Sequence, residues 1–431
     1  MVQLVIWGIV CVAVALSLQK RPTLVLAIVL ILRLLIPSQA GWVLIGNWQG
    51  YAALHPATLL LIVWAAFALL SNAPGVAREW RAHWAIHSLL ALCVTLAVVM
   101  AVTLTGPTAL FGLTNSLLSS ILYFFCLRVV QGSDADAVPI IVRVFVLTMV
   151  VESILVIVQW LAGSNLPWAA VAGVQPGSRP VGTFDSPLDL GLAAAIAIPL
   201  LVTVRSPLPR YVALVLLLAA VVLSESRTPT IMAVVATIII LVLAIRSLRS
   251  LITMVIVVGV GIVAFINLPV LDGLVERFSG DDGSSSAARS VATEYILENI
   301  GSVVVFGNGW GSSYAMKGTV LETSLENGYA ILAFDLGGLA VIALLAAQLL
   351  ILFSRRGMPG AWLAAFFAVL GGFTYSGITT MSAISMVIWA VLAARLSPRP
   401  LKAETLHNEQ LSTAAMPQDK PPLSPLGKGK F

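Results

Sequence analysis

About thirteen long apolar runs limit the folds that this 431-residue chain can adopt. Hydrophobic residues make up 59% of the chain and charged residues only 10%, so a water-soluble protein would lack the polar side chains needed to cover its surface. The expected solvent is therefore a lipid bilayer. Because lipid offers no hydrogen bonds, a run of about 20 apolar residues is expected to cross it as a helix. The runs are too long and continuous for barrel strands.

The predicted crossings form two groups on either side of one long polar segment. Ten precede it, near residues 2–18, 22–37, 55–71, 84–103, 115–131, 139–162, 187–204, 210–224, 228–245 and 249–267. Three follow it, near residues 327–353, 359–375 and 379–396. The expected fold is an all-α polytopic membrane protein with about 12–13 transmembrane helices. Its expected domains are an N-terminal bundle, an extracytoplasmic loop with short helices, C-terminal helices and a disordered cytoplasmic tail, over residues 1–267, 268–326, 327–397 and 398–431.

The basic residues fall mainly in every second gap between the runs and in the C-terminal segment. These positions hold 18 of the 24 Lys and Arg residues. Since basic residues accumulate on the cytoplasmic side of membrane proteins, the pattern predicts an outer N-terminus and a cytoplasmic C-terminus. The net charge of +5 then follows from topology, and no nucleic-acid partner is expected. The three cysteines lie within runs, so neither a disulfide framework nor a zinc site is expected, and no other metal cluster is recognised from spacing.

Two short turns on the predicted outer side place charges beside apolar runs. Residues 177–189 form a Gly- and Pro-rich approach to a run, which would hold Arg179 and Asp185 at the membrane rim. Residues 224–229 form a tight turn in which an unpaired Arg227 would be costly. The simpler interpretations are an internal Arg–Asp pair in the first turn and neutralisation of Arg227 within the second.

The long segment between residues 268 and 326 is expected to form a small outer cap. A helix is predicted from Ser286 to Asn299, with Arg289 near its beginning and an apolar side made of Val291, Tyr295 and Ile296. A glycine-rich turn follows at residues 307–311. It is not a P-loop, because no Lys-Ser or Lys-Thr follows at the required place.

The chain returns to the membrane at Glu326 and Asn327. A carboxylate at this point can serve as a general base, although a helix N-terminus stabilises a negative charge, so capping alone would also explain Glu326. Three more charges lie within runs. Arg33 either snorkels to the surface or meets a phosphate, whereas Glu152 and Asp335 are expected to be hydrogen-bonded packing residues.

The outer charges favour chemistry on a lipid-linked substrate. No nucleotide motif or Ser/His/Asp arrangement is recognisable from spacing, and a reaction outside the cell cannot draw on cytosolic nucleotide sugars. An activated lipid-linked donor is therefore the economical substrate. Arginines would offset the charge of a diphosphate leaving group, and a carboxylate would accept the proton of the attacking hydroxyl.

The order of these motifs resembles the O-antigen ligase and polymerase family. The resemblance covers roughly residues 175–345 and rests on Arg179 with Gly182-Thr183-Phe184, Ser224-Glu225-Ser226-Arg227, Arg289 before Phe306-Gly307-Asn308-Gly309, and Glu326-Asn327 before Leu336-Gly337-Gly338. It implies a C-type, all-helical glycosyltransferase in the bacterial inner membrane, acting on undecaprenyl-diphosphate-linked glycans at the outer leaflet. No nucleotide, metal or other cofactor is implied. The partners would be the lipid-linked glycan, an acceptor glycan or glycolipid, the bilayer and other envelope-biosynthesis proteins.

One departure from the family favours a polymerase over a ligase. O-antigen ligases typically carry a His-Asn pair where the outer loop re-enters the membrane, and this chain has Glu326-Asn327. The resemblance then assigns catalysis to Glu326, Arg227 and Arg289. It assigns substrate and diphosphate binding to Arg179, Arg33, Asp185 and Asn327.

Two other functions remain open from the sequence. A transporter or flippase for a lipid-linked glycan or a small anion would be favoured by internal repeats and by charges along a central path. Glu152 is the main feature in its favour, and no clear repeat is visible. A non-catalytic assembly partner is the third alternative.

Overall fold

Helices make up most of the part of the chain that the structure describes. The computed structural model describes residues 2–38, 54–163, 179–244, 248–266, 283–317, 319, 321, 325–354, 357–379 and 382–396. Within these residues there is no β-strand, and the one bridge pairs Lys317 with Leu321. Residues 1–398 form one unit. The predicted tail lies outside the described residues, as do residues 267–282 of the predicted outer loop.

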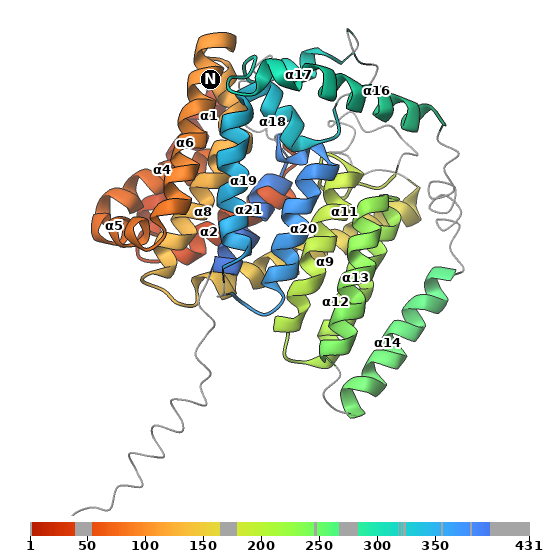
Figure 1. Cartoon of the computed structure of the whole chain (residues 1–431). Helices are drawn as coiled ribbons and strands as arrows, with labels where there is room; N and C mark the ends of the chain where they lie inside the picture. Colours follow the sequence, from red (N-terminus) through yellow and green to blue (C-terminus); the bar gives the residue numbers. More distant parts are fainter. Residues whose placement is uncertain are drawn as a thin grey trace, which may run out of the picture. The chain divides into compact units, whose positions relative to one another are not determined.

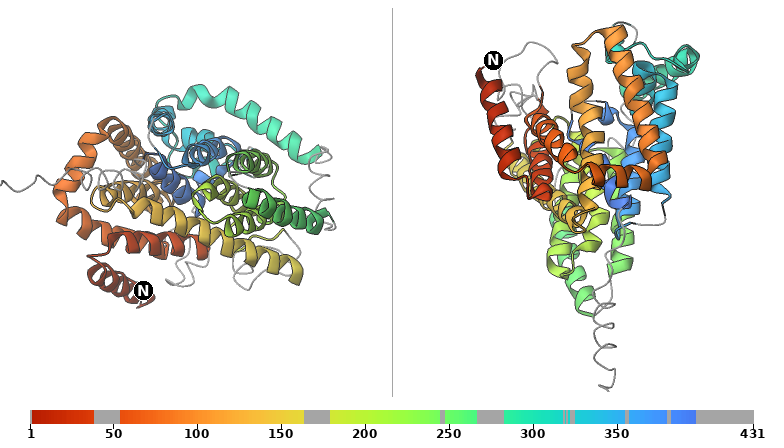
Figure 2. Two further views of the ribbon diagram at one scale, coloured as in Figure 1. Left: turned by 90° about the horizontal axis from the view of Figure 1, so that it is seen from below. Right: turned by 90° about the vertical axis from the view of Figure 1, so that its left-hand side faces the viewer.

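The first half of the chain forms a bundle of helices (Figure 1). Its elements are α1 (Val2–Ser17), α2 (Pro22–Leu35), α4 (Pro56–Ser71), α5 (Ala73–Ala82), α6 (Trp84–Met100), the π-helical η1 (Ala101–Thr105), α7 (Ala109–Leu113), the π-helical η2 (Thr114–Leu118), α8 (Ser119–Gln131) and α9 (Ala137–Ala162). α1 packs along one side of the bundle against α4, as Figure 2 shows from two directions. Pro22 and Pro56 begin α2 and α4, because a proline at the first helical position loses no helical hydrogen bond.

The second half adds two further groups of helices. The first comprises α11 (Pro187–Ala197) with the 3-10 turn η3 (Ile198–Thr203), α12 (Pro207–Leu223), α13 (Arg227–Ala244) and α14 (Leu248–Ile266). The second comprises α16 (Gly283–Asn299), η4 (Ile300–Val303), α17 (Ser312–Ala315), α18 (Gly328–Leu336), α19 (Gly338–Leu352), α20 (Ala361–Thr374), η5 (Ser376–Ile378) and α21 (Ile384–Leu396). Each predicted apolar run therefore contains a helix.

α11 lies at the centre of the bundle. It packs against α9, α12, α13, α20 and α21, and residues 189–197 are all buried. Ala193, Ala194 and Ala195 have no exposed surface, and such small side chains allow neighbouring helix backbones to approach closely. The segment that leads into α11 is thereby held between several other helices.

The structure differs from the sequence prediction in the run over residues 327–353, which is two helices. α18 ends and α19 begins at Gly337, whose φ of 97° lies in the region that favours glycine. A side chain there would collide with the carbonyl oxygen of Val305. The break is therefore required by the close approach of residues 305 and 306, before α17.

The packed side of α16 also differs from the prediction. Val291 is 53% exposed, so its assignment to the apolar side was wrong. Ala292 is buried, and Tyr295 and Ile296 pack beside it in a small cluster with Val303, Leu321, Leu325, Ile331 and Phe334. The packed side is thus the i, i+3, i+4 stripe that begins at Ala292.

Several helices are long and apolar enough to cross a membrane. Among the described residues three qualify, Trp84–Thr105, Ala109–Gln131 and Ala137–Ala162, and a fourth if α4 and α5 are one span bent by 93°. Nine shorter apolar helices accompany them. Their outward faces are also apolar, since Leu161 is 70% exposed, Val242 70% and Phe353 71%. Helices of soluble proteins turn polar faces outward, so this arrangement suits a lipid environment.

Candidate functional site

The Gly182-Thr183 motif is clamped by two polar side chains of α9. The carboxylate of Glu152 accepts the backbone N–H of Thr183 at 3.0 Å, and its other oxygen lies 2.5 Å from the Thr183 hydroxyl. Gln159 accepts the Gly182 N–H at 2.8 Å and donates to the Gly182 carbonyl at 3.1 Å. These contacts agree with the prediction that Glu152 is a packing residue. They hold the segment that carries Arg179 and Asp185.

Gly182 is required in this clamp. Its φ is 63°, and a side chain at this position would run into the Glu152 carboxylate. The motif therefore needs glycine both for its backbone conformation and for the space that the carboxylate occupies.

Arg179 reaches the turn between α12 and α13. Its guanidinium donates to the backbone carbonyl of Ser224 at 3.1 Å. The turn is tight, and Glu225 adopts a φ of 48°, which is costly for a residue with a side chain. Arg227 is the first residue of α13 and is half-buried. Two segments from the family resemblance, each bearing an arginine, are thus in contact.

Arg33 is buried among the helix ends and does not snorkel. It is 2% exposed and donates to the backbone carbonyls of Asn115 at 2.8 Å and Ser382 at 3.2 Å. Asp185 and Asp189 interact with it electrostatically. These contacts with the protein itself can explain why the guanidinium is buried. A role for Arg33 in diphosphate binding remains a prediction.

Asp185 and Asp189 flank the beginning of α11. Asp185 is half-buried and accepts the backbone N–H of Ser38, just after α2, at 3.0 Å. Ser186 caps α11 by accepting the N–H of Leu188 at 3.1 Å. Asp189 is 1% exposed. The approach to α11 thus carries one partly accessible carboxylate and one buried carboxylate.

Two tyrosines, one in α17 and one between α20 and η5, interact with this region. Tyr314 in α17 lies 2.9 Å from the Thr379 hydroxyl. Tyr314 and Tyr375 both interact electrostatically with Asp189. Residues about 60 to 190 positions apart in the chain therefore meet at one end of the bundle.

The glycine-rich turn packs against the break between α18 and α19. Asp335 accepts the backbone N–H groups of Gly311 and Ser313, each at 2.9 Å, and the Ser312 hydroxyl at 3.0 Å. The Asn308 and Gly309 N–H groups donate to backbone carbonyls of α18 at 2.7 Å and 3.0 Å. Asp335 is therefore a packing residue, as predicted, and two more motif segments from the resemblance are adjacent.

Glu326 is exposed, and Asn327 supplies the cap of α18. The Asn327 side chain accepts the N–H groups of Tyr329 and Ala330, both at 3.1 Å. The capping oxygen thus comes from the asparagine and leaves the neighbouring Glu326 carboxylate at the surface. Arg289 lies on α16, but its side chain is outside the described residues.

The sequence prediction missed two histidine sites. His55 caps α4, because Nδ1 accepts the Ala57 N–H at 3.1 Å and Nε2 lies 3.0 Å from the Ile36 carbonyl, which requires the neutral ring. Glu79, His83 and His87 form the other site and are the described residues able to hold a metal ion together. The spacing of four residues between Glu79, His83 and His87 was the signal that the sequence offered.

No protein-family model matches this chain, and no curated protein matches it significantly.

Proposed function

We propose that this protein is a polytopic membrane glycosyltransferase that acts at the outer leaflet. It transfers a glycan from a polyprenyl-diphosphate-linked oligosaccharide to a hydroxyl of an acceptor glycan. The observation that carries the proposal is the 3.1 Å hydrogen bond from Arg179 to the Ser224 carbonyl, which joins two arginine-bearing segments 45 residues apart. Clustered guanidinium groups bind phosphates through charge-assisted hydrogen bonds.

The reaction needs a base, a cation site and an acceptor. The acceptor oxygen attacks the anomeric carbon of the donor sugar, a new C–O bond forms, and the bond from that carbon to the diphosphate oxygen breaks with inversion. The diphosphate leaves with the electron pair, and Glu326 takes the hydroxyl proton. Arg227 and Arg289 stabilise the diphosphate charge, and Arg179 orients the group. The exposed Glu326 carboxylate is accessible for this role.

The proposed setting is a bacterial inner membrane with about 12–13 crossings, an outer N-terminus and a cytoplasmic C-terminus. The apolar outward faces of the helices support it, as does the alternation of basic residues between the runs. Helices of 13 to 17 residues, such as α21 and α12, are shorter than a bilayer core. Burial inside the bundle supports them, since α21 packs against α8, α9, α19 and α20.

The glutamate at position 326 fits a polymerase better than a ligase. The family resemblance expects a histidine beside the asparagine in ligases, and this chain has Glu326. The transporter alternative loses its main support because the Glu152 carboxylate is committed to Thr183. We therefore assign Glu152 to the scaffold and the reaction to the residues at the re-entry points.

The test is reconstitution of the purified full chain in lipid vesicles with a defined undecaprenyl-diphosphate oligosaccharide. A ladder of longer lipid-linked glycans is expected. Arg227→Ala should lower product formation by about 100- to 1000-fold, as removal of a charge-stabilising donor does. Arg205→Ala is the matched control, because Arg205 is exposed and lies between η3 and α12.

Each other outcome has a distinct meaning. A single ligated product from an added acceptor would indicate a ligase. Movement of the lipid-linked glycan without bond formation would indicate a transporter and overturn the proposal. Full turnover by a folded Arg227→Ala protein would remove the assigned role of this arginine.

A further inference from the structure

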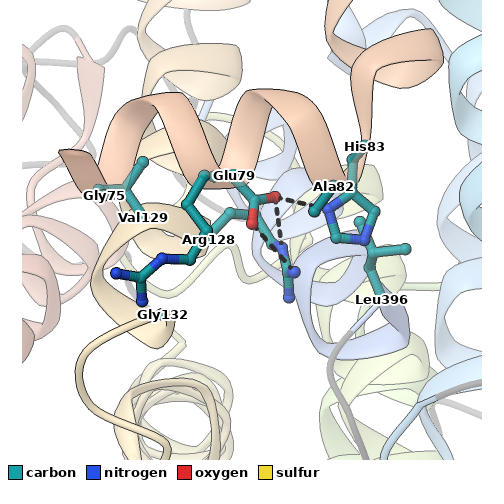
Figure 3. A pocket seen from close by; sticks show the side chains of 9 residues that line it. Gly75, Glu79, Ala82, His83, Arg128, Val129, Gly132 and Leu396 are labelled. Carbon is teal, nitrogen blue, oxygen red and sulfur yellow. Dashed lines mark hydrogen bonds and ion pairs between the residues drawn. The ribbon is translucent and has the colours of Figure 1, made fainter. Parts of the chain in front are cut away.

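Glu79, His83 and His87 converge where α5 meets α6. His83 Nδ1 lies 3.1 Å and His87 Nε2 lies 3.3 Å from the same oxygen, Glu79 Oε1. All three ligand atoms lie within 4.8 Å of one another. Figure 3 shows the contacts of the Glu79 carboxylate with His83 and with Arg128. Two imidazoles and a carboxylate are the ligand set of many zinc sites.

A break in the helix creates this convergence. Residues four and eight positions apart share one face of a straight helix, but the first and last would be about 12 Å apart along its axis. Here His83 has non-helical angles, φ −133° and ψ 37°, and separates α5 from α6. The change of direction brings His87 back to the carboxylate of Glu79.

Two of the three separations match those between ligand atoms around a tetrahedral zinc ion. Bonds of about 2.0–2.1 Å at tetrahedral angles place neighbouring ligand atoms about 3.3 Å apart. The two separations from Glu79 Oε1 are 3.1 Å and 3.3 Å. Small rotations of the side chains would thus suffice to enclose an ion.

Hydrogen bonds alone do not explain why His83 and His87 both lie next to the same oxygen of Glu79. His83 Nδ1 is buried and makes no hydrogen bond of acceptable geometry, although the Glu79 oxygen is close. The same oxygen also lies 3.1 Å from Arg128 Nε and 3.3 Å from His87 Nε2. Two nitrogens therefore hydrogen-bond to this oxygen, which matches its two lone pairs, while the buried His83 Nδ1 lies beside it. An ion shared by the imidazoles and the carboxylate would give His83 Nδ1 a partner.

Arg128 contacts both oxygens of the Glu79 carboxylate, Oε1 through Nε and Oε2 through Nη2. Its Nη2 lies 3.4 Å from Glu79 Oε2, and its Nη1 contacts Gln131. These contacts orient the carboxylate. Metal-binding carboxylates commonly have such an outer hydrogen-bond partner.

A cavity of about 210 Å³ adjoins the cluster. Glu79, His83 and Arg128 are among the residues that line it. Such a volume holds several water molecules. The cavity thus offers an entry path for an ion and space for a water as the fourth ligand.

We propose that Glu79, His83 and His87 bind one divalent transition-metal ion of the Zn²⁺ class. The ion clamps α5 to α6, while Arg128 of α8 positions the carboxylate. The site is separate from the proposed glycosyl transfer, since none of its residues takes part in that reaction. In the proposed topology it lies on the cytoplasmic side, and the role that we assign to the ion is to join α5 to α6.

The test uses the full chain in detergent, purified with a histidine-free tag and stripped with a chelator. Co²⁺ serves as the spectroscopic probe, and Zn²⁺ affinity is measured by competition with a chromophoric chelator. One Co²⁺ per chain with ligand-field bands of a four- or five-coordinate ion is expected. His83→Gln and His87→Gln should each weaken binding at least about 10-fold. His407→Gln is the matched control and should bind as the unaltered chain does.

Several results would overturn the site. These are no binding at a large molar excess of Co²⁺, binding that both variants retain, and spectra of a six-coordinate aqueous ion. Because a variant can fail to fold, amide hydrogen exchange of the unaltered chain is measured with and without Zn²⁺. Protection confined to residues near the junction of α5 and α6 is expected, and unchanged exchange there would contradict the clamp.

Discussion

The chain enters the bundle at two comparable points, before α11 and before α18, and the two approaches are built differently. Before α11, the Gly182-Thr183 backbone is held by Glu152 and Gln159 from α9. Before α18, the Asn327 side chain accepts hydrogen bonds from its own helix, and the adjacent Glu326 is exposed. The first approach is a rigid support for Arg179 and Asp185, and the second presents a carboxylate. In the proposed transfer, the first approach would carry part of the cation site and the second would carry the base.

The largest effect that separates the two approaches is expected from Glu326→Gln. Removing a general base costs about 100- to 10,000-fold in rate. The melting temperature should not change, because the side chain is exposed. Initial rates of product formation and thermal unfolding measure the two quantities.

Glu326→His should be compared with Glu326→Gln. It should retain much of the rate, because ligases of the family are proposed to use a histidine there. Full activity of Glu326→Gln would show that the proposed base is wrong.

Gly182→Ala tests the rigidity of the first approach. It should destabilise the protein by about 1–3 kcal/mol from backbone strain alone, and by more because its side chain meets the Glu152 carboxylate. Gly163→Ala is the matched control, since Gly163 has a φ of 60° and nothing lies within 4 Å of an added side chain. Thermal or denaturant unfolding gives the difference. Equal losses in the two variants would mean that the Glu152 clamp adds nothing.

Asn327→Ala should give the smallest effect, about 1 kcal/mol, which is the usual loss for a helix cap. Asn327→Ser keeps a capping oxygen and should restore most of the stability. Activity separates the two roles of the residue. If both variants lose activity while Asn327→Ser keeps its stability, Asn327 binds substrate; if Asn327→Ser keeps activity, it is a cap only.

The sequence predicted the helices well because apolar runs and proline starts are local signals. The predicted runs over residues 139–162 and 187–204 correspond to α9 and to α11 with η3. It did not predict the break at Gly337, which depends on Val305 from another segment. For the same reason it placed Val291 on the packed side of α16, since periodicity gives a stripe but not the neighbour that covers it.

Only part of the candidate site could be predicted from the sequence. Charge alternation assigned Arg179, Arg227 and Glu326 to one predicted side, and the structure adds the contact between Arg179 and Ser224. The structure also distinguishes carboxylates that support the fold from one that is accessible. Glu152 and Asp335 accept backbone N–H groups, whereas Asn327 caps α18 and Glu326 is exposed.

The sequence by itself determined the helical fold, the positions of the helices and the predicted sides of the charges, because these follow from composition and spacing along the chain. Only the tertiary structure decided the partner of each buried polar group. Arg33 meets Ser382 across 349 positions, and Glu79 meets Arg128 across 49. A buried polar group must find a hydrogen-bond partner, and which one it finds depends on how distant helices pack.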